Sequence, residues 1–117
     1  MKLAHPRPDN PGTDHPGLLL RRDVLPALEL SVSQAARELG IARQTLHRIM
    51  AGVAPITPEM AVRLERLCGV PSGFWLDRQQ RHELPRIRQE IANDLTRIPS
   101  HPLPREVLAH IGASDEG

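Results

Sequence analysis

The sequence predicts an all-α fold, and three observations support this prediction. Apolar residues recur at spacings of three and four along most of the chain, which is the period of helices that bury one face. Gly40, Gly52 and Gly69 follow three of these segments, and glycine is the residue that most often ends a helix. No segment has a convincing alternation of apolar and polar residues, the pattern that is typical of strands.

The composition favours one small domain with an aliphatic core. The chain has 117 residues, of which 39% are hydrophobic and only 2% aromatic. Its net charge of +1 does not by itself indicate a nucleic-acid partner. Cys68 is the only cysteine, which excludes an intrachain disulfide. Because no apolar run approaches the roughly 18–20 residues of a membrane span and no signal peptide is recognisable, we expect a cytoplasmic protein with no membrane partner.

The N-terminal part begins with a proline-rich stretch, residues 1–14, which is predicted to be a flexible arm. The first helix should begin near His15-Pro16-Gly17, and Pro26 should end or kink it. Ser31 and Gln34 then have the spacing of a capping box, in which each side chain bonds the backbone N–H of the other residue. A second helix should therefore start at this point.

The second helix is predicted to end at Gly40, and a third should run from about Arg43 to Met50. Thr57-Pro58 is a typical helix start, and its helix should stop at Gly69. Beyond that point, Leu84-Pro85 is predicted to break the chain between two helices. Further helical segments are expected at 72–83, 86–98 and 105–111.

The second and third helices are short, so they must be packed on one another to be stable. A small residue at Ala36, a turn at Gly40 and aliphatic residues at Ile41 and Leu46 predict a helix-turn-helix arrangement. Its outer face carries hydrogen-bonding side chains and no carboxylate. These are typical of a helix that reads DNA: arginine bonds guanine, glutamine bonds adenine, and a threonine methyl contacts thymine. The candidate DNA-binding residues are Gln34, Arg37, Ala42, Arg43, Gln44, Thr45, His47 and Arg48.

Within this set the expected roles differ. Arg43, Gln44 and Thr45 lie at the start of the helix, where base edges are nearest, and His47 and Arg48 lie one turn further on. Gln34 either contacts a phosphate or is held by the capping box. Arg37 either reaches a phosphate or is simply solvated. The alternative for the whole face is an ordinary solvated helix surface.

Segments outside the motif resemble a known family. His15-Pro16-Gly17 with Leu19-Leu20-Arg21, the stretch Pro55-Ile56-Thr57-Pro58-Glu59-Met60-Ala61 with Arg63-Leu64, and Gly69 through Phe74-Trp75-Leu76 resemble the Xre-type helix-turn-helix proteins, and among them the HigA-type antitoxins. The resemblance covers residues 15–84 and implies a five-helix, lambda-repressor-like DNA-binding domain there; the apolar spacing beyond it predicts a helical C-terminal extension and tail at 85–117. It also implies a homodimer on an inverted repeat of operator DNA and a small RelE-like ribonuclease toxin, similar to HigB, as partner.

A dimer needs an apolar surface, and two groups of residues are candidates. Ile87, Ile91, Leu95 and Ile98 form an amphipathic stripe that closes a dimer or covers the bundle. Phe74 and Trp75 form an interface or fill the core. The candidate dimer residues are Phe74, Trp75, Ile87, Ile91 and Leu95.

Other functions are not expected. The histidines have no zinc-site spacing, and no nucleophile–base pair or phosphate-binding loop is present, so we expect no metal, no cofactor and no catalytic residue. Two alternatives to an antitoxin stay open: a repressor without a toxin, and a protein-binding module whose helix-turn-helix no longer contacts DNA.

Overall fold

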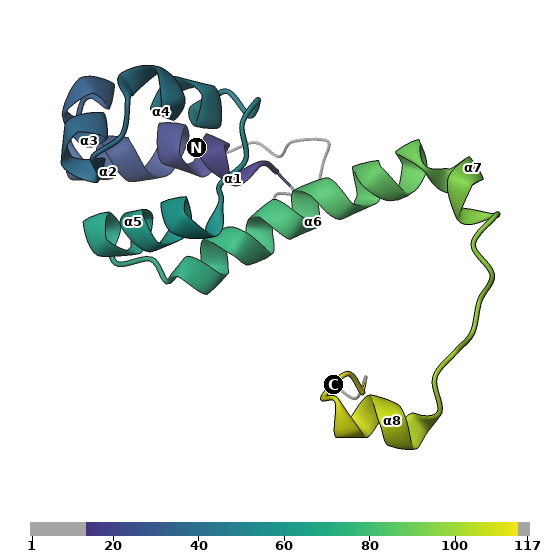
Figure 1. Cartoon of the computed structure of the whole chain (residues 1–117). Helices are drawn as coiled ribbons and strands as arrows, with labels where there is room; N and C mark the ends of the chain where they lie inside the picture. The colour runs from purple at the N-terminus through teal and green to yellow at the C-terminus, as the bar shows by residue number, and fades with distance from the viewer. Residues whose placement is uncertain (1–13, 115–117) are drawn as a thin grey trace, which may run out of the picture. The chain divides into compact units, whose positions relative to one another are not determined.

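The computed structural model describes residues 14–114, and Figure 1 shows that this part of the chain is helical. No strand is present between residues 14 and 114, which confirms the predicted fold class. The predicted arm at 1–14 lies outside the described residues except for Asp14, which is buried and lies 3.9 Å from the Arg22 guanidinium. The chain divides into two compact units, one ending at Ile87 and one beginning at Arg88.

The first unit begins with a continuous helical segment made of α1 (Pro16–Leu19), η2 (Leu20–Val24) and α2 (Leu25–Leu28). The middle element, η2, is a wider π-helical turn that ends two residues before Pro26. Pro26 has no N–H to donate to an α-helical ladder. The segment nevertheless continues two residues beyond Pro26. It ends at Glu29, a non-glycine residue in the left-handed conformation with φ of 57°.

The helix-turn-helix consists of α3 (Val32–Leu39) and α4 (Arg43–Met50). The Ser31 hydroxyl accepts a hydrogen bond from the Gln34 backbone at 3.0 Å, as predicted. The described part of the chain has no bond from the Ser31 N–H to the Gln34 side-chain oxygen, so the other half of the predicted capping box is absent; the Gln34 Nε2 atom donates to Glu38 at 2.9 Å.

Two further helices complete the first unit. Helix α5 (Pro58–Cys68) starts at the Thr57 cap and ends at Gly69, as predicted. Helix α6 (Ser72–Glu90) continues through Leu84-Pro85, so the predicted break there is wrong. Pro85 has lost a single backbone donor, and its ring is exposed on the helix surface, where it meets solvent rather than a packed neighbour.

The core of the first unit is aliphatic with one aromatic residue. Trp75 is only 1% exposed, and its Nε1 atom has no hydrogen-bond partner. The other buried side chains of this core cluster come from η2, α2, α3, α4 and α5 and from the loop between α4 and α5. They are Leu20, Leu25, Ala35, Ala36, Leu39, Leu46, Ile49, Met50, Ile56, Met60, Ala61 and Leu64.

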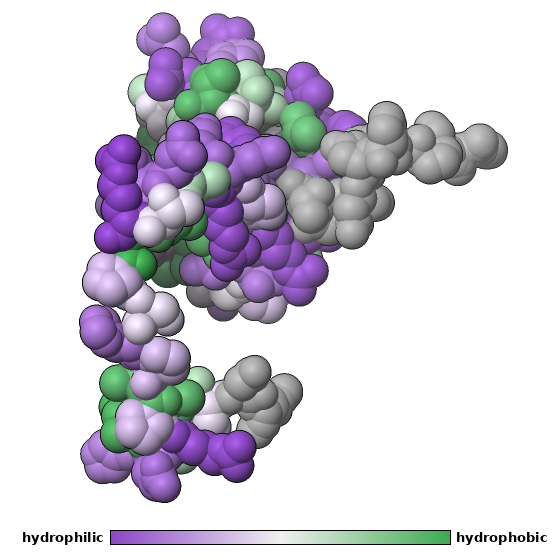
Figure 2. All heavy atoms as spheres, turned by 90° about the vertical axis from the view of Figure 1, so that its right-hand side faces the viewer, coloured by the Kyte–Doolittle hydropathy of each residue, from purple (hydrophilic) through white to green (hydrophobic). Residues whose placement is uncertain are grey.

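The second unit holds the end of α6, the short α7 (Ala92–Leu95) and α8 (Arg105–His110). The predicted helix over 86–98 is wrong as one element, because α6 stops at Glu90 and a new turn starts at Ala92. The predicted helical turns near 105–111 are confirmed by α8. No described residue from Arg88 onward is buried, and Figure 2 shows apolar side chains exposed around α8. Between residues 14 and 114, no helix combines the length and apolarity that crossing a bilayer requires.

Candidate nucleic-acid interface

The turn between α3 and α4 fixes how the second of these helices is presented. Gly40 is left-handed with φ of 75°, a conformation that other residues adopt only under strain. The Gly40 N–H bonds the Arg37 carbonyl, and the Ile41 N–H bonds the Ala36 carbonyl at 3.0 Å. Together these bonds close the C-terminus of α3. The chain then reverses into α4 with the buried sides of both helices against the core.

The outer face of α4 is polar and solvent-exposed, as the sequence predicts. Leu46, Ile49 and Met50 face the core, and the remaining side chains of the helix point outward. In the part of the chain that the structure describes, none of these outward side chains bonds another residue, so their donors and acceptors are available to a ligand. They are Arg43, Gln44, Thr45, His47 and Arg48.

The start of α4 adds backbone donors to this face. Ala42 is the N-cap residue, and alanine has no side chain that can accept a hydrogen bond. The first-turn N–H groups therefore have no side-chain acceptor. Free N–H groups at a helix N-terminus attract phosphate oxygens.

Both candidate residues on α3 are exposed, and one of them is engaged. The Gln34 Nε2 atom donates to Glu38, a partner that was not predicted from the sequence. Arg37 is exposed in the last turn of α3.

Helix α4 rests on α1 through a close backbone contact. A Cβ atom built on Gly17 collides with the Ile49 carbonyl oxygen, so only glycine allows this approach. Just before it, the His15 Nδ1 atom accepts a hydrogen bond from the Gly17 N–H at 2.9 Å. The His15 ring meets that of His82 from α6 at a centroid distance of 5.1 Å. Burial, and then the neighbouring His82, lower the pKa of His15 below its ordinary value of 6.5.

Two supporting residues were not found by sequence reasoning. Gln79 is buried, and its Oε1 atom accepts a hydrogen bond from the Ile56 N–H at 2.9 Å, which ties the loop after α4 to α6. Arg63 of α5 donates to the Leu39 carbonyl at 2.7 Å. The four-residue spacing of Glu59 and Arg63 was a usable signal for their ion pair. No local pattern points to the long-range bonds of Gln79 or Arg63.

The candidate dimer residues fall into two groups. Trp75 belongs to the core, so its assignment to an interface is corrected: a side chain 1% exposed offers no surface to a partner. Phe74, Ile87, Ile91 and Leu95 are exposed by 37–41%. Phe74 also lies under the Arg78 guanidinium, 5.1 Å from its ring centroid.

The described residues contain no group of three or more His, Cys, Asp or Glu side chains placed to hold a metal ion.

Comparison with known proteins shows which family the chain is similar to. Residues 20–75 match a family described as helix-turn-helix. Virulence-associated protein A of Dichelobacter nodosus is 34% identical over 94 residues, which cover 80% of this chain and 92% of that protein.

Solved structures of antitoxins have the same fold. The antitoxin HigA of Pseudomonas aeruginosa, solved with the higBA promoter, has a TM-score of 0.68 at 25% identity over 78% of this chain and 99% of that one. The antitoxin GraA has a TM-score of 0.67 at 26% identity over 77% of this chain and 97% of that one. The chain therefore belongs to the Xre-type helix-turn-helix family, and its structure is strongly similar to those of HigA antitoxins.

Proposed function

We propose that this chain is the antitoxin of a HigBA-type module, which represses its own operon as a dimer and neutralises a RelE-like mRNA-cleaving toxin. The observation that carries the repressor half is the outer face of α4. That face is exposed, contains no carboxylate, and holds side chains whose donors and acceptors are unused in the described part of the chain.

Each residue of the interface has a proposed role. Arg43 and Gln44 read base edges from the first turn of α4, and the Thr45 methyl packs on thymine. His47 and Arg48 reach bases or phosphates one turn further along. The first-turn N–H groups after Ala42 bind a phosphate oxygen.

Two residues of α3 contribute less specifically. Arg37 adds a phosphate contact from its exposed position. Gln34 adds a phosphate contact through the second N–H of its amide, beside the one that bonds Glu38.

The dimer follows from the proposed operator symmetry, because an inverted repeat presents two half-sites to two copies of the protein. The exposed apolar side chains of Phe74, Ile87, Ile91 and Leu95 are the proposed contact. The toxin half is supported only by the similarity to proteins named as antitoxins.

The first test is fluorescence anisotropy with DNA from directly upstream of the gene, against a scrambled duplex, at two salt concentrations. Tighter binding to the native duplex that weakens as salt rises is expected, because base contacts and counterion release act together. Equal, salt-insensitive binding to both duplexes would contradict the repressor role and favour a protein-binding module.

The second test addresses the toxin. The chain is co-expressed with the product of any small adjacent reading frame, and growth and co-purification are measured. Rescue of growth together with a stable complex is the expected result. If the gene has no such neighbour, or its product is harmless, the chain is a repressor without a toxin.

A further inference from the structure

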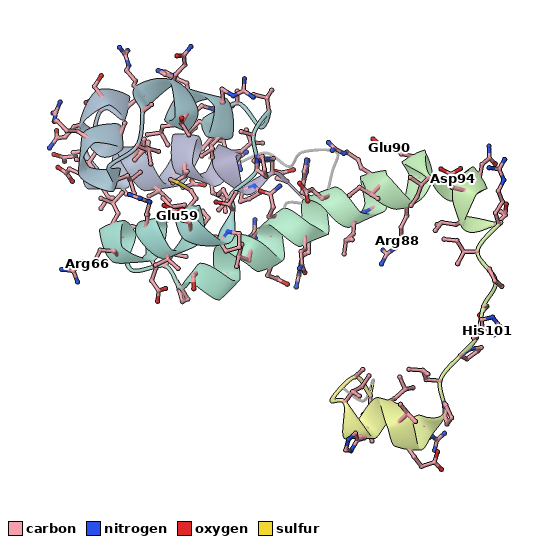
Figure 3. The ribbon with its side chains drawn as sticks, viewed as in Figure 1. Glu59, Arg66, Arg88, Glu90, Asp94 and His101 are labelled. Carbon is pink, nitrogen blue, oxygen red and sulfur yellow. The ribbon has the colours of Figure 1, made fainter. Side chains whose placement is uncertain are left out.

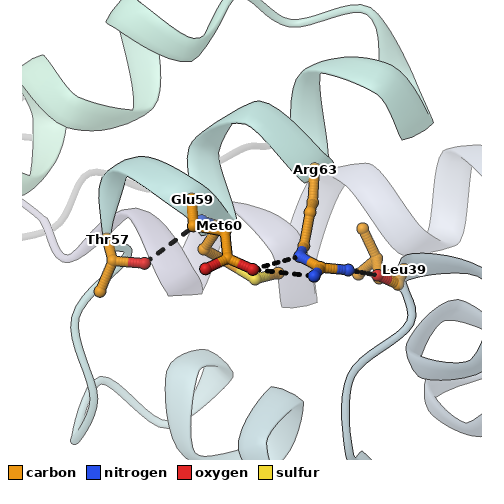
Figure 4. Close-up of polar contacts among 5 residues, drawn as sticks. All are labelled: Leu39, Thr57, Glu59, Met60 and Arg63. Atoms are coloured by element: carbon orange, nitrogen blue, oxygen red, sulfur yellow. Dashed lines mark hydrogen bonds and ion pairs between the residues drawn. The ribbon is translucent and has the colours of Figure 1, made fainter.

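Arg63 of α5 makes three hydrogen bonds, two within its own helix and one to the end of α3, the first helix of the helix-turn-helix (Figure 4). Its Nη1 atom donates to the Leu39 carbonyl at 2.7 Å. Its Nε and Nη2 atoms donate to one carboxylate oxygen of Glu59 at 3.2 and 2.8 Å. The guanidinium therefore has a fixed orientation, set by a partner in the first turn of its own helix.

The carbonyl that Arg63 bonds lies at a sensitive point. Leu39 is the last residue of α3, and Gly40 makes the turn into α4. A Cβ atom on Gly40 would lie 3.0 Å from Arg63 Nη1, so the guanidinium fits directly against the turn. Arg63 thus connects α5 to the turn at Leu39-Gly40, whose backbone conformation sets the direction in which α4 leaves α3.

Packing alone does not fix α4 against α5. An open apolar groove of about 310 Å³ runs between them, with Ile41 and Thr45 on one side and Met60 on the other. This side of α4 is incompletely filled, so the hydrogen bonds at the two ends of α4 add to the constraint that its packing on α1 and α3 already provides. These are the Arg63 bond before α4 and the bond of Gln79 to Ile56 after it.

The charge of Arg63 does not explain its position. Its ion pair with Glu59 is solvent-exposed, and such pairs contribute little to stability on their own. The Glu59 carboxylate also offsets the positive charge with which Arg63 would attract a phosphate. The geometry of the fork is the feature that only arginine supplies, since lysine has no fixed planar set of donors.

We propose that Arg63 is a positioning residue for base reading: it holds the turn at Gly40 so that α4 enters the major groove at the angle its side chains require. This inference rests on the proposed DNA-binding function. Arg63 acts through α4 and does not contact DNA.

The test compares Arg63→Gln and Arg63→Lys with Arg66→Gln. Arg66 is the matched control, because it lies on the same helix, is exposed and points away from the bundle (Figure 3). Binding to the native and scrambled duplexes is measured at a temperature where thermal melts show each variant folded. Residual dipolar couplings of free protein report the angle between residues 43–50 and 58–68.

Arg63→Gln should weaken native-duplex binding by about tenfold or more, comparable to losing one base contact. Its binding to the scrambled duplex should change only as much as that of Arg66→Gln, which loses the same charge. Arg63→Lys keeps the positive charge and removes only the planar donor geometry of the guanidinium. It replaces Arg63→Gln in the test if the glutamine variant is unfolded. In both Arg63 variants the couplings should change, and in the control they should not.

Unchanged couplings and full discrimination in folded Arg63 variants would overturn the proposal. Equal weakening on both duplexes would also overturn it, in favour of a phosphate contact. If wild-type protein prefers neither duplex while the couplings still change, Arg63 sets the helix angle, and it is the proposed function that fails.

Discussion

At the scale of single residues, the contact between Gly17 and the Ile49 carbonyl is the tightest constraint on the interface. It brings the first turn of α1 against the backbone of α4, so any side chain at position 17 must push the two helices apart. Gly73 in α6 is also helical, yet a Cβ atom there meets nothing within 4 Å. The two glycines thus differ in what surrounds them.

Gly17→Ala should lower the free energy of unfolding by about 1–3 kcal/mol or more, the usual cost of overpacking a filled site. Gly73→Ala should leave it unchanged or raise it by up to about 1 kcal/mol, because alanine is the better helix former. Urea unfolding measures both. Equal effects at the two positions would show that the Gly17 contact is not a close one.

A second residue-scale feature is the state of His15. Its Nδ1 atom accepts a hydrogen bond from the Gly17 N–H, so this nitrogen carries no proton and the ring is neutral. A proton on Nδ1 would remove the acceptor and place a charge in a buried site beside His82, which together outweigh the Ala54 backbone hydrogen bond and Glu83 that favour the charged ring. Both effects disfavour the protonated form in the folded state.

The folded-state pKa of His15 is lowered, so its stabilising effect is complete above pH 6.5 and is lost as the pH falls below that value. Between pH 6.5 and 5.5 the free energy of unfolding should therefore decline, by at most about 1.4 kcal/mol per pH unit from this site. His15→Asn keeps a capping side chain and removes the titration, so its pH profile should be flatter.

His101→Asn is the control for this pH dependence. His101 lies exposed between α7 and α8 (Figure 3), and its replacement should leave the wild-type slope intact. Urea unfolding at a series of pH values measures all three proteins. Identical slopes for wild type and His15→Asn would contradict the assigned role.

At the scale of elements, α4 is expected to contact bases and α3 to contact phosphates. Arg43→Ala on α4 should cost about 1–3 kcal/mol on the native duplex and relax base preference at one position. Arg37→Ala on α3 should weaken binding evenly across sequences and lower the salt slope by about one. Anisotropy titrations against single-base operator variants separate the two patterns, and unchanged discrimination by Arg43→Ala would rule out its base contact.

Helix ends were predictable where the signal is local. Ser31 and Thr57 are caps whose hydroxyls bond a backbone three residues on, and Gly40 and Gly69 are left-handed residues that end their helices. Each depends on a few adjacent residues, so the sequence alone contains the information. The exposed outer face of α4 was predictable for the same reason, since helical period alone separates it from Leu46 and Ile49.

Predictions failed where the outcome depends on the built helix or on contacts between distant parts of the chain. Pro85 is a helix breaker by propensity, but the established turns of α6 tolerate one missing donor. The Gln34 amide bonds Glu38 one turn further along α3, a contact that becomes possible only once the helix has formed. The bonds of Arg63 and Gln79 cross 24 and 23 residues, and no spacing rule reveals such contacts.

At the scale of the whole molecule, buried surface is confined to the first unit. No described residue from Arg88 to Ser114 is buried, and large apolar side chains such as Ile98, Leu103 and Ile111 are exposed by 51–64%. Short amphipathic helices without a core are not stable by themselves. A second copy of the chain, which the proposed operator symmetry requires, would cover part of this surface.

Ile91→Asp places a charge in the proposed dimer contact and should convert a dimer into a monomer in sedimentation equilibrium. Operator binding should weaken with it, because two half-sites would no longer be filled by one assembled particle. Val62→Asp is the matched control: Val62 is an exposed apolar residue of α5 outside the contact, and its replacement should leave the dimer intact. A dimer that survives Ile91→Asp but dissociates in Val62→Asp would move the interface to α5.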